Sequence, residues 1–152
     1  MSNRWLLVIL LAIVALLNYL DRQVIFSLLP LLRGDLHLTD PQMGLLGATF
    51  LWIYAFCSLF AGWMAQKFGH RRVILASLCA WSVVTLLTGL STGFVSLAAT
   101  RAAMGVTEAF YIPAALALVT AACPSQLRSR AVSLHQSGIY FGILLGGGPA
   151  AF

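Results

Sequence analysis

The sequence consists of long apolar runs separated by short polar or turn-rich segments. The runs cover residues 5–32, 41–65, 73–90, 95–122 and 131–152. Each is close to the roughly 20 residues that an α-helix needs to cross a hydrocarbon core about 30 Å thick. The runs lack the alternating polarity of a transmembrane barrel strand, and the unpaired edges of an open sheet are excluded in lipid. We therefore predict an all-α membrane protein with about five transmembrane helices.

The composition agrees with this prediction and excludes one class of partner. Hydrophobic residues make up 61% of the chain and charged residues only 9%, whereas a soluble domain has about 25% charged residues. The net charge of +5 is compatible with nucleic-acid binding, but the basic residues lie in short clusters between apolar runs or singly within them. This arrangement offers no basic face to a phosphate backbone. The expected environment is the lipid bilayer, and nucleic acid is not an expected partner.

The charged residues between the runs predict how the helices are oriented. One set of flanking segments is basic and contains Arg4, Lys67, Arg71, Arg72, Arg128 and Arg130. The intervening segments hold one arginine against two aspartates at residues 33–40 and no charge at residues 90–94. Because basic residues beside membrane helices are retained in the cytoplasm, we predict a multi-pass protein of the plasma or inner membrane with a cytoplasmic N-terminus. The first run lacks a small-x-small cleavage site and is interpreted as a retained span.

Two further features concern the boundaries of the bundle. Thr39, Asp40 and Pro41 predict the start of the second helix, with a capping side chain followed by proline at the first helical position. Five helices would place the C-terminus on the outer side, directly after a glycine-rich helix. We therefore expect residues 1–152 to be an incomplete N-terminal transmembrane bundle that lacks the C-terminal bundle of the same chain.

Four ionisable residues remain at membrane depth, namely Asp21 and Arg22 in the first run and Arg101 and Glu108 in the fourth. A charge at the centre of a membrane helix costs about 2.5–3.5 kcal/mol on insertion scales, so such residues usually face the bundle interior or a wet cavity. One interpretation is that they form structural ion pairs that fix helix packing. We favour the other, a substrate pathway or proton relay, because that is the usual role of an ionisable group inside a membrane.

The spacing in the fourth run places its polar residues on one face. Arg101 and Glu108 are two helical turns apart, and Gly105 lies between them. Pro113 follows five residues after Glu108 and permits a bend beside the carboxyl group, because proline has no N–H to donate. Tyr111 lies next to these residues and is a candidate for substrate contact.

The first run shows a matching stripe. Asn18, Asp21, Arg22 and Ile25 follow the i, i+3, i+4, i+7 pattern of one helical face. Tyr19 lies beside the charged pair and is a second aromatic candidate. We therefore predict a cavity between the first and fourth helices.

The fifth run contains glycines at every fourth position, Gly138, Gly142 and Gly146. This spacing is typical of a close helix contact, although a flexible gate near Pro149 is an alternative. His135 is compatible with a polar path through the same helix.

Enzymatic and metal chemistry have little support in the sequence. Residues 89–93 match the G-x-S-x-G nucleophile pattern, but they end a membrane helix at a short loop instead of forming a strand-to-helix elbow. His37, His70 and His135 are too scattered for a metal site, and no H-E-x-x-H motif occurs. We predict no enzyme activity, no metal and no cofactor.

The connection between the second and third runs, Gly-Trp-Met-Ala-Gln-Lys-Phe-Gly-His-Arg-Arg at residues 62–72, resembles the signature loop of the major facilitator superfamily. Gln66 departs from the pattern because the family has an aspartate there. The resemblance implies a cytoplasmic conformational latch formed by Gly62, Lys67, Gly69, Arg71 and Arg72. It also implies a fold of twelve helices in two six-helix bundles, each built from inverted three-helix repeats.

Residues 18–22 in the first run, together with Arg101, Gly105, Glu108 and Pro113 in the fourth, resemble motifs of two branches of that family. These are the spinster-like lipid transporters and the anion:cation symporters. The resemblance implies that Asp21 and Glu108 are protonation sites, and that Arg22 and Arg101 bind an anionic small-molecule substrate or pair with those acids.

The sequence thus predicts a secondary active transporter that works by alternating access and couples protons to the transport of an organic anion. A lysolipid or lipid-like substrate exporter and a non-transporting membrane scaffold remain alternatives.

Overall fold

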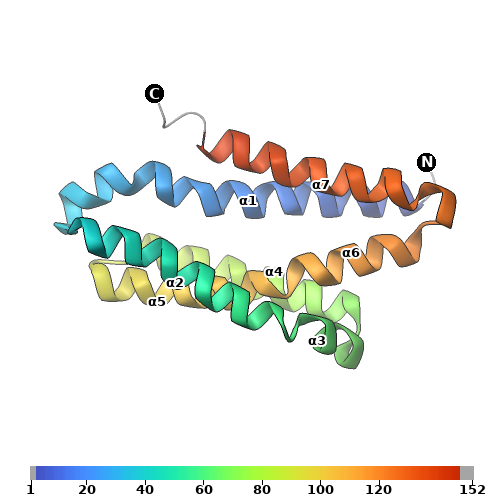
Figure 1. The fold of residues 1–152 in the computed structure, drawn as a ribbon, viewed down its shortest axis with the longest axis horizontal. Coiled ribbons are helices and arrows are strands. Elements are labelled where there is room, and N and C mark those ends of the chain that lie inside the picture. Colours follow the sequence, from blue (N-terminus) through green and yellow to red (C-terminus); the bar gives the residue numbers. More distant parts are fainter. Residues whose placement is uncertain (1–2, 148–152) are drawn as a thin grey trace. The chain divides into compact units, whose positions relative to one another are not determined.

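The computed structural model describes residues 3–147, and these form seven helices joined by short connections (Figure 1). The helices are α1 (Asn3–Leu36), α2 (Asp40–Ser58), α3 (Ala61–Phe68), α4 (His70–Gly89), α5 (Phe94–Ala109), α6 (Tyr111–Ala122) and α7 (Ser125–Gly147). The described residues contain no strand, so the predicted all-α class is confirmed. Pro149, at the alternative gate, lies outside the described residues.

The helices correspond only in part to the predicted spans. Three segments are long and apolar enough to cross a membrane, Asn3–Leu28, His70–Gly89 and Phe94–Ala122. The bent pair α2 and α3 provides a fourth if it counts as one span. Within the described residues α7 is not among these segments, so a fifth transmembrane helix remains a prediction. The apolar helices show that the chain is an integral, multi-pass membrane protein.

The chain divides into two compact units, which are described separately. The first comprises residues 1–30 and 115–152, and the second comprises residues 31–114. Helix α7, the larger part of α6 and α1 up to Pro30 belong to the first unit, whereas α2 to α5 belong to the second.

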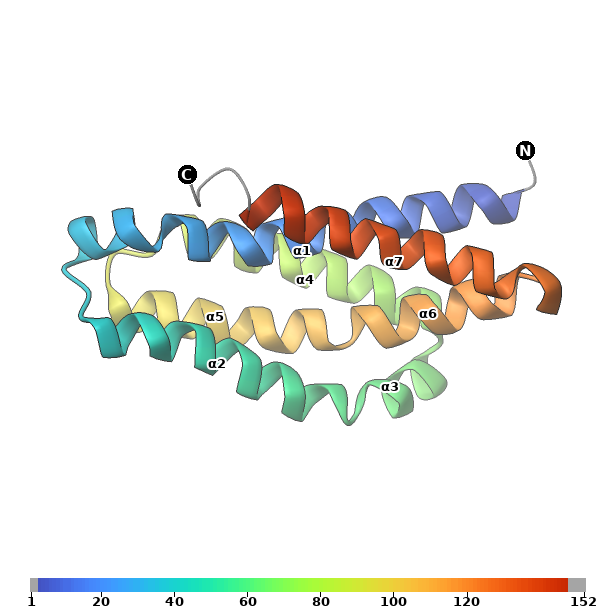
Figure 2. The same cartoon turned by 45° about the horizontal axis from the view of Figure 1, so that its top comes forward.

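In the first unit α7 lies along α1 (Figure 1 and Figure 2). Three glycines of α7 face three carbonyl oxygens of α1 that are four residues apart. A β-carbon added to each glycine would lie 2.3 Å from the oxygen of Ala12 at Gly138, 2.4 Å from that of Leu16 at Gly142, and 2.6 Å from that of Leu20 at Gly146. The hydroxyl group of Ser27 also donates a hydrogen bond to the Gly146 carbonyl at 2.9 Å. The predicted close-packing face is confirmed, because only glycine allows the two backbones to approach this closely.

In the second unit α5 packs between α2 and α4. Its core contains Phe50 of α2, Val84 of α4 and Met104 of α5. Gly105 lets α5 approach α2, since a β-carbon there would lie 2.8 Å from the Phe50 carbonyl oxygen. The axis bends by 52° between α2 and α3, so the apolar run of residues 41–65 is two helices and not a straight one.

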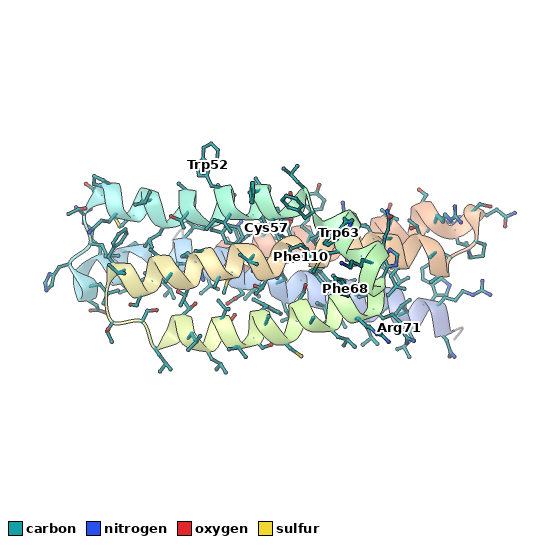
Figure 3. All side chains as sticks on the ribbon, turned by 90° about the horizontal axis from the view of Figure 1, so that it is seen from below. Trp52, Cys57, Trp63, Phe68, Arg71 and Phe110 are labelled. Atoms are coloured by element: carbon teal, nitrogen blue, oxygen red, sulfur yellow. The ribbon has the colours of Figure 1, made fainter. Side chains whose placement is uncertain are left out.

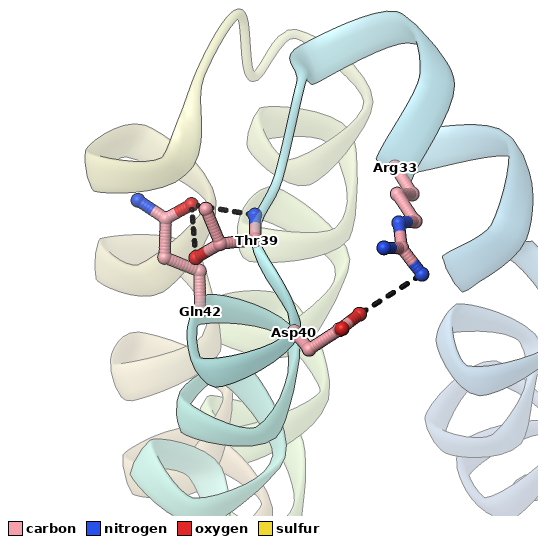
Figure 4. A network of polar contacts seen from close by, with 4 residues as sticks. All are labelled: Arg33, Thr39, Asp40 and Gln42. Atoms are coloured by element: carbon pink, nitrogen blue, oxygen red, sulfur yellow. Dashed lines mark hydrogen bonds and ion pairs between the residues drawn. The ribbon is translucent and has the colours of Figure 1, made fainter.

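The start of α2 follows the sequence prediction with two differences (Figure 4). Thr39 is the N-cap residue, but its side chain makes no cap hydrogen bond. Instead, the Gln42 side-chain oxygen accepts a hydrogen bond from the Thr39 backbone N–H at 2.9 Å, which is the reciprocal half of a capping box. The helix begins at Asp40, and Asp40 forms an ion pair with Arg33 at 2.9 Å. Pro41 therefore occupies the second helical position and not the first.

Candidate functional site

The predicted residues of the first helix share a short segment of α1. Asn18 is buried, while Tyr19, Asp21 and Arg22 are half-buried. The guanidinium carbon of Arg22 lies 5.0 Å from the centroid of the Tyr19 ring, within the range of a cation–π interaction. These two residues are three positions apart and therefore lie on one face of the helix. The structure places the cation of Arg22 over the ring of Tyr19.

The contact with α7 determines the position of this segment. A β-carbon at Gly142 would lie 3.0 Å from the β-carbon of Tyr19 and 3.1 Å from the backbone nitrogen of Leu20. Any side chain at that position would push against the same turn of α1 that carries Tyr19. The packing of α7 against this turn therefore limits how far the segment with Tyr19, Asp21 and Arg22 can shift or rotate within the first unit.

The predicted residues of the fourth span are buried. Arg101 is 4% exposed, Glu108 is 2% exposed and Tyr111 is 1% exposed. One terminal nitrogen of Arg101 donates to the sulfur of Met104 at 3.3 Å. Met104 is itself completely buried in the core cluster of the second unit. Since thioether sulfur is only a weak acceptor, this contact orients the guanidinium group without neutralising its charge.

Helix geometry separates Glu108 from Tyr111. Helix α5 ends at Ala109, Phe110 is the residue between the helices, and α6 begins at Tyr111. Pro113 consequently lies in the first turn of α6, where its missing N–H removes no hydrogen bond. The two helices still pass as one membrane span, Phe94–Ala122. The break lies at the position where the sequence predicted a bend beside the Glu108 carboxyl group.

Asp21 and Arg22 belong to the first unit, whereas Arg101 and Glu108 belong to the second. Asp21 and Arg22 are neighbours on α1, and Arg101 and Glu108 lie two turns apart on α5. A cavity shared by the two sets remains a prediction.

The latch residues lie at the junction of α3 and α4. Gly69 ends α3 with a φ of 86°, and its N–H donates to the Ala65 carbonyl at 3.0 Å. The ammonium group of Lys67 lies 4.7 Å from the ring centroid of Trp63 and 5.4 Å from that of Phe68. A positive φ of this kind favours glycine because other residues carry a β-carbon that clashes with the backbone. The backbone conformation therefore explains why a glycine stands at position 69.

The other three latch residues, Gly62, Arg71 and Arg72, are exposed. Both arginines belong to the first turn of α4. The loop therefore presents its positive charge at one end of α4, and no described residue between Pro41 and Thr107 is acidic.

His135, which the sequence placed on a possible polar path through the fifth run, is buried in α7. Its side chain has no exposed surface, and it lies one turn from Gly138 on the face of α7 that contacts α1. The signal that could have identified this is the spacing of three and four residues among Ala131, His135, Gly138 and Gly142, which places the histidine on the glycine face. Among the described residues, no group of three metal-ligating side chains occurs.

Comparison with known proteins finds related transporters. The chain is 30% identical over 141 residues to the D-galactonate transporter of Escherichia coli O6:H1, and this match covers 93% of the chain and 33% of that protein. It is 32% identical over 150 residues to a Bacillus subtilis protein named "Probable galactarate/D-glucarate transporter GudP", covering 95% of the chain and 33% of the relative. It is 34% identical over 119 residues to "Probable sulfoacetate transporter SauU" of Cupriavidus necator, covering 78% of the chain and 28% of the relative.

The chain thus spans about a third of the length of these relatives. All three are named as transporters, which agrees with the prediction that the protein is not an enzyme. Their named substrates are organic acids, as in the anion:cation symporter branch that the motifs resemble. The family profile described as Major Facilitator Superfamily matches residues 11–152. The chain belongs to the major facilitator superfamily.

Proposed function

We propose that this chain forms the N-terminal part of a secondary active transporter that moves an organic anion by alternating access, with protons as the coupled ion. The observation that carries the proposal is the buried pair of ionisable residues on α5. Arg101 and Glu108 lie two turns apart on a helix that Gly105 allows to pack directly against α2. Burying an arginine and a glutamate in a membrane helix is costly, and a site that binds an anion and a proton accounts for both.

The names of the relatives support the substrate class. D-galactonate, galactarate, D-glucarate and sulfoacetate all carry carboxylate groups, and sulfoacetate also carries a sulfonate. Guanidinium groups suit such oxyanions because they donate two parallel hydrogen bonds from a planar fork. Arg22 and Arg101 would supply them, with Asn18, Tyr19 and Tyr111 as neutral polar contacts.

Proton coupling would act through the two acids. Protonation of Asp21 or Glu108 removes a negative charge beside an arginine, so the arginine becomes available to the substrate anion. A ligand shifts the transporter between states only by binding one of them more tightly. The protonated, anion-loaded site would favour rocking of this bundle against a second one, as in other transporters built from repeats. Gly62, Lys67, Gly69, Arg71 and Arg72 would latch the cytoplasmic side in one state. The orientation would place the N-terminus in the cytoplasm and the protein in the plasma or inner membrane.

The test is substrate uptake driven by a pH gradient in proteoliposomes, using the complete protein that carries this sequence. The panel contains D-galactonate, D-glucarate, sulfoacetate and a lysolipid. Glu108→Gln removes the ionisable proton while keeping the size of the side chain, and Asp35→Asn makes the same change at an exposed position. We expect accumulation of at least one organic anion, its loss in Glu108→Gln and its retention in Asp35→Asn.

Three other outcomes would contradict parts of the proposal. Uptake that ignores both the gradient and the Glu108 change would remove proton coupling. Flux of the lysolipid without flux of any organic anion would assign the other substrate class. A protein that folds normally and moves none of the panel would favour the scaffold alternative.

A further inference from the structure

The second unit contains an apolar groove that reaches the proposed latch at Arg72 but contains none of the proposed substrate and proton residues. It has a volume of about 410 Å³ and lies among α3, α4 and α5. Its walls include Met64 and Phe68 of α3, Ala76 of α4, Val106 of α5, and Phe110 at the end of α5. Figure 3 shows Phe68 and Phe110 near each other at the end of the unit where α3 meets α4. The volume falls within the range of small-molecule sites, about 300–1,000 Å³.

The groove has one charged end and an apolar body. On α4 its lining runs from Arg72 to Ala80, which is roughly 12 Å along the axis of a helix. Arg72 belongs to the first turn of α4, a helix long enough to span the membrane. Arg72 therefore lies at the membrane interface, and the groove extends from there toward hydrocarbon depth. The Thr107 hydroxyl donates to the Met104 carbonyl at 3.0 Å, so it adds little polarity to the wall.

The charge at the mouth has no acidic counterpart nearby in the sequence. Lys67, Arg71 and Arg72 follow one another within six residues, and no Asp or Glu occurs between Pro41 and Thr107. Gln66 stands where the family has an aspartate, so the loop itself supplies no negative charge. Basic residues at the cytoplasmic interface attract anionic lipid, each contributing about 1 kcal/mol near the surface. A ligand that fits must therefore have an anionic head and an apolar tail.

We propose that this groove binds one acyl chain of an anionic phospholipid of the cytoplasmic leaflet, with the phosphate group held by Arg72 and its basic neighbours. The lipid is a resident of the bilayer and not the transported substrate. Its headgroup supplies the negative charge that Gln66 does not, at the junction where Gly69 joins α3 to α4. The bent end of the second span is thereby tied to the lipid as well as to α4.

The test measures phospholipid retained by the complete protein, purified from vesicles of phosphatidylglycerol and phosphatidylcholine and analysed by native mass spectrometry. Arg72→Gln removes the headgroup contact, and Arg130→Gln makes the same charge change at an exposed residue that does not line the groove. Ala76→Phe fills the groove, and Leu75→Phe adds bulk at an exposed neighbour on α4 outside the lining. None of the four residues belongs to the proposed substrate and proton site. Because Arg72 is part of the proposed latch, the readout is lipid retention and not uptake.

We expect one phosphatidylglycerol molecule to be retained in preference to phosphatidylcholine. Arg72→Gln should weaken its binding about fivefold, and Ala76→Phe should abolish its retention. Arg130→Gln and Leu75→Phe should bind as the parent protein does. Equal retention by Ala76→Phe and Leu75→Phe, or equal retention of the two lipids, would overturn the proposal. A photoreactive amino acid at position 76 that crosslinks to another segment of the protein instead of to lipid would also overturn it, because the groove would then be a protein contact.

Discussion

The close contact between α1 and α7 gives a prediction with a built-in control. In Gly142→Ala the new β-carbon would lie 2.4 Å from the Leu16 carbonyl oxygen, where ordinary contacts begin near 3.4 Å. Relief requires the helices to separate by about 1 Å, because the obstacle is backbone and not a side chain that can rotate. Overpacking of this kind costs about 1–3 kcal/mol. A gap of that size also forfeits a quarter to a half of each dispersion contact across it.

The control is Gly44→Ala in α2, where an added β-carbon meets nothing within 4 Å. Both substitutions gain the same intrinsic helix propensity, about 1 kcal/mol. Their difference therefore isolates the cost of the clash. We expect Gly44→Ala to melt at or above the temperature of the parent protein and Gly142→Ala to melt clearly below Gly44→Ala.

The assay is thermal unfolding of the purified complete protein in detergent, followed by tryptophan fluorescence. The reasoning would be refuted if the two variants melted together, because α7 would then not be held at carbonyl distance from α1. A lower melting temperature in both variants would instead point to a general intolerance of added methyl groups.

Two further predictions concern the connections of the second unit. Gly69→Ala should destabilise by about 1–3 kcal/mol, because a residue with a β-carbon is strained at a φ of 86°, whereas Gly62→Ala in open space within α3 should not. Equal melting temperatures in thermal unfolding would contradict this. Asp40→Asn breaks the ion pair with Arg33, and the side chains of Asp40 and Arg33 are 71% and 56% exposed. The loss of stability should therefore stay below about 1 kcal/mol and become smaller in high salt. A larger loss of stability that does not depend on salt, measured by the same method, would show that this ion pair is not a weak surface interaction.

Much of the helical architecture could be predicted from the sequence because lipid leaves few alternatives. The apolar runs indicate helices by length alone, and Thr39 marks the start of α2 as the structure has it. The bend between Ser58 and Ala61 could not be predicted, since no proline lies there and apolar residues continue on both sides of it. The groove beside α4 was equally hidden, because residues that line an apolar groove are of the same types as residues that face lipid.

The candidate site was predictable in its residues but not in its contacts. Arg101 and Glu108 stand out because charge is rare in an apolar run, and both are buried. The hydrogen bond from Arg101 to the Met104 sulfur escaped notice because methionine counts as apolar in any pattern. His135 likewise required knowledge of which face of α7 meets α1. Periodicity identifies a face, whereas the partner of that face follows only from packing.

The break at Phe110 leads to the last prediction, because proline has different consequences at two places in this chain. Helix α1 continues through Pro30, whereas α5 and α6 are separate helices just before Pro113. In Pro113→Ala the restored N–H can donate to the Ala109 carbonyl, so the two helices can join. Pro113 lies in the first turn of α6, where proline is tolerated. Its exchange for alanine therefore costs little and adds a hydrogen-bond donor, so the variant should melt at or above the temperature of the parent. Joining the helices would rotate Tyr111 relative to Glu108, and uptake driven by a pH gradient should fall.

Pro30→Ala is the matched control, since it makes the same exchange in a helix that is already continuous, and it should leave uptake unchanged. Uptake at the parental rate in Pro113→Ala would show that the break is a consequence of the proline and not a part of the transport site. Equal loss of uptake in both variants would mean that stiffening any helix impairs the cycle. A selective loss in the more stable Pro113 variant would separate function from folding, and it would place the break between Glu108 and Tyr111 in the coupling mechanism.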